Sequence, residues 1–502
     1  VPEIKASRHN AGTAFIVFDD HRRSNWTPYV YRTTDFGKTW TSLVTPTIQG
    51  YALAIEQDPV DPELLFLGTE FGLWVSNDAG RNWLKWKHGF PTASVMGLAI
   101  QPREHDLVIG THGRAAFVID DIRPLRTVSK ELMAKPVHFF EVPDAQSYTT
   151  RQKEGSRFLG DAEFRGENEP YGALLTYSLS GANLPHPAEE KERARKEAER
   201  VAAQKPAFSE TGVPAEMPTD IPKEPEASAT EKPQPKPGES QTADKPKVDD
   251  KATEVDIEVA DASGKVIRKF KGPAVQGLNR TAWDLTRDPF KQPRSDEQGA
   301  FGFGGGVEVP PGTYTVTLKF RGNEAKQTVR VLPDPRERYT AEQRQAKYSA
   351  ILRAGALQET ASEALDRIAR TKTDIDAVNA KLKKDDPKAD PDPLVKTGND
   401  LKEKLDAVGK RLRIPPQTRG IVADTDVWTK IGFPIYAMQS SWDAPTEAQL
   451  QYLARAEAQL RIVLADVNKV FADDVAKYRE QVRAGNNLVL LPEEKPLEVS
   501  KQ

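Results

Sequence analysis

The chain of 502 residues contains no cysteine, no long apolar run and almost no net charge. Without cysteine, disulfide staples, thiolate zinc sites and a cysteine nucleophile are all excluded. The net charge of −3 argues against a nucleic-acid partner, because domains that bind nucleic acids are strongly basic. No apolar run reaches the ~18 residues that a membrane-spanning helix needs, so we expect no membrane span.

The length and composition predict several domains. At ~100–200 residues per domain, the chain is long enough for about three. Its 29% charged residues, 38 prolines and 33 glycines suit a soluble multidomain protein with a disordered connection. The first ten residues show neither an initiator Met nor a signal-peptide pattern, and we interpret the chain as a piece of a longer protein.

An internal repeat occupies residues 1–128. The repeat contains two well-formed copies of a short turn motif and a third, degenerate copy that keeps only its aspartate, Asp121. Short β-rich runs precede each copy, and a period of 43 residues is typical of propeller blades, so we predict three blades of a β-propeller. The two well-formed copies read Thr33-Thr34-Asp35-Phe36-Gly37-Lys38-Thr39-Trp40 and Ser76-Asn77-Asp78-Ala79-Gly80-Arg81-Asn82-Trp83.

The shared pattern Ser/Thr-x-Asp-x-Gly-x-Thr/Asn-Trp resembles the Asp-box (BNR repeat) of sialidase-type and sortilin-type β-propellers. In that family the motif lies on the turn between the third and fourth strands, at the outer rim. The resemblance implies structural roles: the aspartate accepts N–H bonds in its turn, glycine permits positive φ, and the indole packs between sheets. The residues concerned are Asp35, Gly37, Trp40, Asp78, Gly80 and Trp83.

Three repeats are fewer than the ~4–8 blades of a closed propeller. Because the third copy is degenerate and leads into a non-repeating region, we expect residues 1–128 to be the last three blades, with the partner blades N-terminal to this chain. The alternative is that oligomerisation completes the propeller. Along its length the chain resembles the C-terminal portion of secreted bacterial proteins of the Asp-box, sortilin-like and glycosyl-hydrolase-like class.

Propellers of this type bind ligands at one face, lined by the loops that join second to third strands. On that scheme the site lies on residues 19–26, 70–72 and 112–114, which carry the acid/base, charge-clamping and stacking groups of a sugar or acidic-substrate site. The alternative is a set of solvated hairpin loops with local ion pairs. Candidate catalytic residues are Asp19, Asp20 and Glu70; candidate substrate-binding residues are His21, Arg22, Arg23, Trp26, His112 and Arg114.

Two functions stay open from the sequence. The sortilin-like resemblance implies an exported protein that binds a glycan or a peptide at the propeller face. The alternative is a glycoside hydrolase whose loop carboxylates flank the scissile bond. The arginine triad and nucleophilic tyrosine of true sialidases have no match. We expect no metal and no cofactor, because zinc-protease, nucleophile-elbow, dinucleotide and EF-hand motifs are absent. The resemblance implies a secreted, periplasmic or cell-envelope location.

We expect a second β unit after the blades. Residues 129–184 would hold connecting strands and the first strand of a β-sandwich, and residues 253–334 alternate with period two and would complete it. Segments 277–285 and 311–318 resemble immunoglobulin-like modules of bacterial secreted and hook-capping proteins. Residues 185–252, rich in Pro, Lys and Glu, would be a disordered insertion. A flexible loop, with no phosphate-binding role, would contain Gly302, Gly304, Gly305 and Gly306.

Residues 335–484 carry helical patterns, and residues 485–502 form a tail. Capping boxes begin at Thr340 and Thr446. Three apolar stripes predict a three-helix hairpin or bundle, with a partner-docking face as the alternative. Residues 387–393 would separate the first two helices, and a long connection with Trp428, Gly432-Phe433-Pro434 and Trp442 would precede the third. The stripes are Leu365, Ile368, Ile375 and Leu382; Leu401, Leu405, Val408 and Leu412; and Leu450, Leu453, Leu460, Leu464, Val467 and Phe471.

Overall fold

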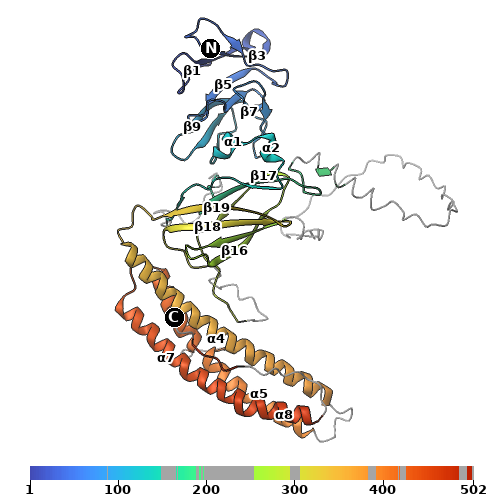
Figure 1. Cartoon of the computed structure of the whole chain (residues 1–502), viewed down its shortest axis with the longest axis vertical. Coiled ribbons are helices and arrows are strands. Elements are labelled where there is room, and N and C mark those ends of the chain that lie inside the picture. The colour runs from blue at the N-terminus through green and yellow to red at the C-terminus, as the bar shows by residue number, and fades with distance from the viewer. Residues whose placement is uncertain are drawn as a thin grey trace, which may run out of the picture.

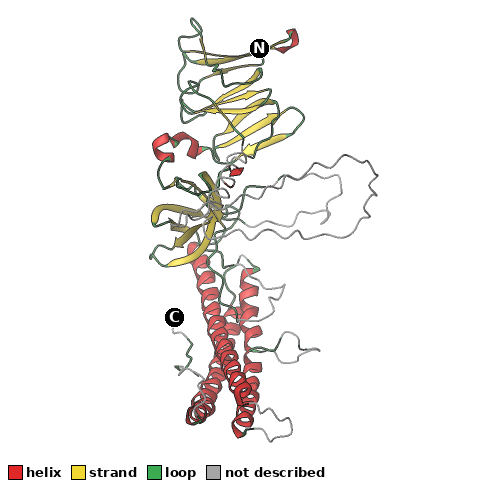
Figure 2. Ribbon diagram, turned by 90° about the vertical axis from the view of Figure 1, so that its right-hand side faces the viewer, coloured by secondary structure: helices red, strands yellow, loops and turns green. Residues whose placement is uncertain are grey.

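The chain is elongated, with sheets at its N-terminal end, a second β unit in the middle and helices at the other end (Figure 1). The long helices lie apart from the strands along the long axis, whereas a few short helical turns lie among the strands (Figure 2). Most of the predicted insertion lies outside the described residues, as do Gly302, Gly304, Gly305 and Trp442. This computed structural model describes residues 1–87, 89–148, 166, 168–187, 192–193, 196, 254–293, 306–382, 392–415, 418, 426–441, 443–485 and 495–499.

Three antiparallel sheets form the N-terminal end, and in each of them consecutive strands pair as a meander. The first sheet consists of β1 (Glu3–Ala6), β2 (Ala14–Asp20), β3 (Asn25–Thr33) and β4 (Thr41–Ser42). The second consists of β5 (Ala52–Gln57), β6 (Leu65–Thr69), β7 (Gly72–Ser76) and β8 (Leu84–Lys85). The third consists, among the described residues, of β9 (Val95–Gln101), β10 (Asp106–Thr111) and β11 (Ala116–Ile119).

The sheets stack because alternate side chains of the middle sheet point to opposite faces. On β6, Leu65 and Leu67 join the hydrophobic cluster shared with the first sheet, whereas Phe66 joins the cluster shared with the third. All three side chains are fully buried. A strand that is buried on both faces reads as a continuous apolar run, as this one does. Stacked meanders of this kind are the arrangement of neighbouring blades in a β-propeller.

A buried ion pair fastens the end of the third sheet to the second. The short helix α1 (Arg123–Thr127) carries Arg126, whose Nη2 lies 2.9 Å from Oδ2 of Asp58. Asp58 is fully buried, and its Oδ1 also accepts the N–H groups of Val60 and Asp61. Removing one partner would leave an uncompensated buried charge, so the pair holds this connection in place. Helix α2 (Lys130–Met133) follows.

The middle unit is built from two sheets that share one hydrophobic core. Tyr177 from one sheet and Ile257 and Val316 from the other are all fully buried. The Tyr177 hydroxyl donates to the carbonyl of Pro273 across the two sheets at 2.6 Å. The relation to immunoglobulin-like modules stays a prediction. The strands are β12 (Val137–Phe139), β14 (Ala173–Leu179) and β17 (Gly277–Trp283), facing β13 (Ala145–Gln146), β19 (Asn323–Leu332), β18 (Gly312–Phe320), β15 (Glu254–Ala260) and β16 (Val266–Pro273).

The C-terminal part is helical, and its helices pack around a common core. Both predicted capping boxes form, since Thr340 with Gln343 and Thr446 with Gln449 exchange reciprocal side-chain and backbone hydrogen bonds. No helix in the described part of the chain is long and apolar enough to cross a membrane. The helices are α4 (Ala341–Leu382), α5 (Pro393–Leu412), α6 (Val427–Gln439), α7 (Glu447–Val470) and α8 (Ala476–Ala484), with the π-helical turn η3 (Phe471–Val475) between the last two.

The predicted long connection before the last stripe is wrong, because α6 occupies it with Pro434 inside the helix. Val427, Ile431 and Ile435 recur at i, i+4 spacing and are buried, and this burial offsets the backbone hydrogen bond that proline removes. The proline and glycine concealed that pattern in the sequence. Leu450 was also misplaced: it is 42% exposed on the first turn of α7, and the buried stripe begins at Leu453.

Candidate functional site

The end of β2 and the turn that follows it hold an aspartate and a histidine together. Nδ1 of His21 lies 2.6 Å and 2.8 Å from the two carboxylate oxygens of Asp19. The backbone N–H of His21 donates to the same carboxylate at 3.0 Å. When Nδ1–H donates to the carboxylate, Nε2 of the neutral ring is left as a hydrogen-bond acceptor.

The surroundings of Asp19 favour its ionised form. Burial works to raise the pKa of Asp19, but the hydrogen bonds from the backbone and ring of His21 and the charge of Arg22 together lower it below 3.8. At neutral pH this carboxylate therefore accepts hydrogen bonds and has no proton to donate. The general acid of a glycosidase needs the opposite shift, a raised pKa.

Tyr51, which the sequence analysis missed, completes a cluster of rings. It directly precedes β5, and its ring stacks on His21 with centroids 4.5 Å apart and planes 16° apart. The Trp26 ring lies 5.9 Å from Tyr51 and 6.1 Å from His21. Trp26 is 54% exposed, so this aromatic platform of His21, Trp26 and Tyr51 offers an indole surface to solvent.

Glu70, in the turn between β6 and β7, lies beside the aromatic platform. Its backbone N–H donates to the carbonyl of Tyr51 at 3.0 Å. Burial raises the pKa of the Tyr51 hydroxyl, and the charges of Glu70 and Asp19 raise it further. Two of the three candidate catalytic carboxylates therefore act electrostatically on one tyrosine.

The third predicted loop, residues 112–114, is linked to the Glu70 turn through Ser94. The Ser94 hydroxyl donates to the carbonyl of Glu70 at 3.1 Å, and the N–H of His112 donates to the carbonyl of Ser94 at 2.9 Å. Gly113 and Ala115 adopt positive φ values of 75° and 58° in this tight turn. The three loops thus follow one another along the same edge of the stacked sheets, as the sequence predicted from their positions in the repeat.

Other candidate residues lie at the margin of this site. Asp20, the last residue of β2, is engaged locally: its carboxylate lies 3.3 Å from Nδ2 of Asn25 and 3.8 Å from Nε of Arg23. Arg22, His112 and Arg114 are exposed. The structure therefore gathers Asp19, His21, Trp26 and Glu70 around Tyr51, and leaves the arginines in solvent around them. An aromatic residue ahead of an apolar run gives no sequence signal of such a role.

A second polar cluster crosses the first strands of the three sheets. Lys5 on β1 forms ion pairs with Glu56 on β5 and with Glu3, and donates to the carbonyl of Leu98 on β9 at 2.9 Å. Glu3 in turn accepts the N–H of Ile55 at 2.6 Å. One ammonium group thus links all three sheets. The sequence signal was Glu56 directly after the apolar run of residues 52–55, since unpaired carboxylates are rarely buried.

The two repeated turns use their carboxylates internally. Hydrogen bonds from the hydroxyl and N–H of Thr39 hold the pKa of Asp35 below its ordinary value. Burial opposes the same shift at Asp78, but hydrogen bonds from the side chain and N–H of Asn82 and from Ser76 lower its pKa. This geometry belongs to the turns themselves and presents no free carboxylate to a ligand.

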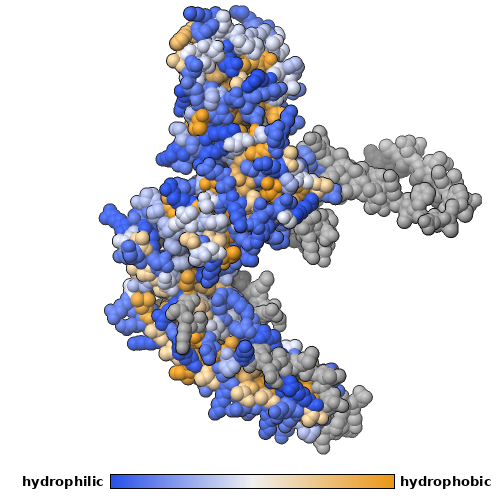
Figure 3. All heavy atoms as spheres, viewed as in Figure 1, coloured by the Kyte–Doolittle hydropathy of each residue, from blue (hydrophilic) through white to orange (hydrophobic). Residues whose placement is uncertain are grey.

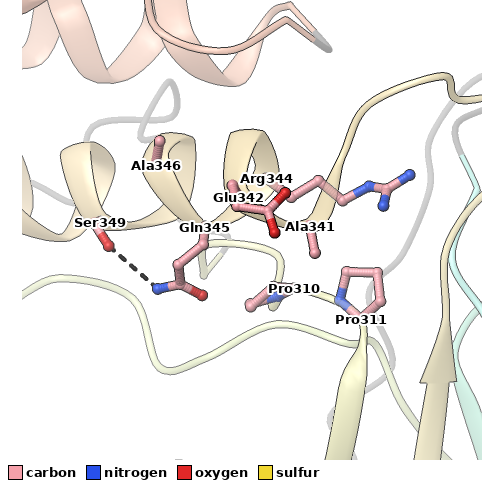
Figure 4. A pocket seen from close by; sticks show the side chains of 8 residues that line it. All are labelled: Pro310, Pro311, Ala341, Glu342, Arg344, Gln345, Ala346 and Ser349. Atoms are coloured by element: carbon pink, nitrogen blue, oxygen red, sulfur yellow. Dashed lines mark hydrogen bonds between the residues drawn. The ribbon is translucent and has the colours of Figure 1, made fainter.

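A surface cavity of about 540 Å³ lies far along the chain, where the loop before β18 meets the start of α4 (Figure 4). Its walls are Pro310 and Pro311 on one side and the first turns of α4 on the other. Gln345 donates to the Ser349 hydroxyl, and Arg344 is paired with Glu337. In the described parts of the chain, no group of three or more acidic or histidine side chains could hold a metal ion.

Parts of the chain are similar to three solved propeller-type structures. The GH74 enzyme of Niastella koreensis shares 21% identity over 24% of this chain and 21% of that one, with a TM-score of 0.21. The GH74 xyloglucanase of Xanthomonas campestris shares 15% over 36% and 27%, with a TM-score of 0.21. YCF48 bound to D1 peptide shares 17% over 24% and 36%, with a TM-score of 0.19.

This chain therefore spans about a third or less of the length of these structures. Similarity of this extent carries no conclusion about ligand or activity. No protein-family model matches the sequence, and no curated protein matches it.

Proposed function

We propose that the edge formed by the three loops binds a carbohydrate chain without cleaving it. The observation that carries the proposal is the aromatic platform of His21, Trp26 and Tyr51 beside the carboxylates of Asp19 and Glu70. A sugar ring has apolar C–H faces that pack flat on an aromatic ring, and its hydroxyl groups donate to carboxylates.

Binding is favoured over hydrolysis by the state of Asp19. A glycosidase needs one carboxylic acid with a raised pKa and a second carboxylate about 5–10 Å away. The pKa of Asp19 is lowered, and both of its oxygens are within 2.8 Å of the His21 ring. Asp19 therefore orients His21, and Glu70 is the carboxylate left to meet a sugar hydroxyl.

The proposal also includes the fold that contains this site and the cellular location of the protein. The two Asp-containing turns and the stacked meanders support a place for these sheets in an Asp-box β-propeller. The resemblance to that class supports a role outside the cytoplasm, in the envelope or secreted.

The test is retention of the full-length chain on a panel of immobilised polysaccharides, with released reducing ends measured in parallel. We expect Trp26→Ala to weaken retention about tenfold or more, because it removes the exposed stacking surface. Trp40→Ala is the matched control, since Trp40 is another exposed tryptophan, 41% accessible, on the repeated turn between β3 and β4. Its retention should equal that of the unmodified chain.

The other outcomes are distinct. Equal retention of both tryptophan variants, or no retention at all, contradicts the carbohydrate proposal. Release of reducing ends that Glu70→Gln abolishes would instead establish the hydrolase. Retention of extended peptides but of no polysaccharide, again lost with Trp26→Ala, would make the ligand a peptide.

A further inference from the structure

A second large aromatic side chain, Phe71, is exposed beside the aromatic platform. It lies in the turn between β6 and β7, directly after Glu70, and is 41% exposed. In the view of Figure 3 the surface of the N-terminal sheets is mostly hydrophilic, with smaller apolar patches. A single exposed apolar side chain needs no explanation, but Phe71 and Trp26 are both exposed at the same edge of neighbouring sheets.

A buried threonine fixes the turn that carries Phe71. The Thr69 hydroxyl accepts the N–H of Phe71 at 3.2 Å and the indole N–H of Trp74 at 3.1 Å. Thr69 is fully buried, so water does not compete for these hydrogen bonds. A turn that is already ordered lowers the entropy cost of binding a ligand on it.

Gly50 packs against the ring of Phe71 and connects it with the aromatic platform. A Cβ added at Gly50 would lie 2.9 Å from Cδ2 of Phe71 and 3.0 Å from Cβ of Glu70. The next residue is Tyr51, whose carbonyl accepts the N–H of Glu70 at 3.0 Å. The missing side chain at Gly50 therefore lets the Phe71 ring pack directly beside the residues of the platform.

The two exposed rings belong to different sheets. Trp26 is on β3 of the first sheet, and Phe71 follows β6 of the second. The contacts run from Trp26 through Tyr51 and Glu70 to Phe71. Stacked sheets lie about 10 Å apart, which is wider than one sugar ring. One sugar unit therefore cannot cover both rings, whereas a chain of several units can.

We propose that Phe71 provides a second stacking surface, and that the site binds the interior of a linear carbohydrate chain several sugar units long. This inference rests on the proposed carbohydrate function and specifies its ligand. Once one ring is occupied, the units on the second ring belong to the same chain and bind at a high effective concentration. The affinity therefore depends on chain length, and a disaccharide reaches only one of the two rings.

The test compares carbohydrate fragments of different length by titration calorimetry with the full chain. The probes are size-sorted fragments, from disaccharide to octasaccharide, made by partial acid hydrolysis of the polysaccharide that the unmodified chain retains. We expect the octasaccharide to bind about tenfold or more tightly than the disaccharide. Phe71→Ala should abolish this difference and leave disaccharide binding unchanged, because the disaccharide binds on the larger platform around Trp26.

Three further variants show whether the flat ring is what matters. Phe71→Tyr keeps a ring and should keep the dependence on length. Phe71→Leu keeps an apolar side chain against Gly50 but has no flat face, so it should behave like Phe71→Ala even where Phe71→Ala lowers the melting temperature. Phe36→Ala is the matched control, since Phe36 is 79% exposed on the repeated turn between β3 and β4. It should bind every fragment as the unmodified chain does.

Two results would overturn this inference and leave carbohydrate binding intact. One is equal affinity for the disaccharide and the octasaccharide, with both weakened by Trp26→Ala. The other is a dependence on length that neither Phe71→Ala nor Phe71→Leu reduces. If no polysaccharide is retained, or if Trp26→Ala leaves retention unchanged, the proposed function itself is wrong and this inference is wrong with it.

Discussion

The Asp35 turn and the Asp78 turn have the same internal hydrogen bonds but different surroundings. Trp83 is 3% exposed, and its Nε1 donates at 2.9 Å to the carbonyl of Leu43, which directly follows β4 of the first sheet. Trp40, at the same place in the other copy, is 41% exposed and donates within its own turn at 3.2 Å. The motif alone therefore shapes the turn, whereas the neighbouring sheet determines the environment of the indole.

The same difference extends over whole faces of the sheets. On the second sheet, Leu67 and Trp74 are paired across strands and buried against the first sheet. Their counterparts on the first sheet, Ile16 and Tyr31, are paired in the same way but are only partly buried. The outer face of the first sheet is thus apolar and uncovered by the described residues. That further blades cover it stays a prediction.

The strongest test of this comparison is removal of each indole. Trp83→Ala should lower the free energy of unfolding of the N-terminal sheets by about 3–5 kcal/mol, because it leaves a cavity between two sheets. Trp40→Ala should cost about 1 kcal/mol or less. Calorimetry of the full chain measures both as shifts of the transition assigned to the sheets. Equal losses would show that the indoles contribute through the turn and not through the neighbouring sheet.

The two glycines of the turns give a smaller contrast. Gly37 and Gly80 have φ values of 83° and 84°, so alanine at either position costs about 1–2 kcal/mol of backbone strain. At Gly80 the added Cβ would also lie 3.1 Å from a methyl of Leu43, which adds about 1–3 kcal/mol of crowding. At Gly37 the nearest atom is 3.9 Å away, on Trp40. The comparison fails if Gly37→Ala proves the more damaging substitution in urea unfolding.

The carboxylate of Asp78 should show the smallest, pH-dependent effect. Asp78→Ala should cost about 1–3 kcal/mol at neutral pH, because the turn loses its acceptor. The pKa of Asp78 in the folded chain lies below its ordinary value of 3.8, so the ionised form stabilises the fold above that pH. This contribution is lost as the pH falls through the lowered pKa. Melting curves of both chains should therefore converge in acid; a gap that widens there would contradict the assignment.

Local features were predictable because they depend on residues close in sequence. The capping boxes, the residues of the two repeated turns and the short apolar run of β6 are all recognised from residues within a few positions of one another. The α6 helix was missed for the same reason: Pro434 and Gly432 dominate any local reading, and only packing of Val427, Ile431 and Ile435 into the helical core reverses it.

For the candidate site, the sequence by itself determined which loops share an edge, because the repeat places each loop at the same point of its sheet. It did not determine which side chains meet. Tyr51, which directly precedes the second sheet, stacks on His21 of the first. Lys5 on the first sheet donates to the carbonyl of Leu98 on the third. Such contacts join residues far apart in the chain, and no local pattern records them. The tertiary structure alone decided them, because the burial and charge that fix each side chain come from the neighbouring sheets.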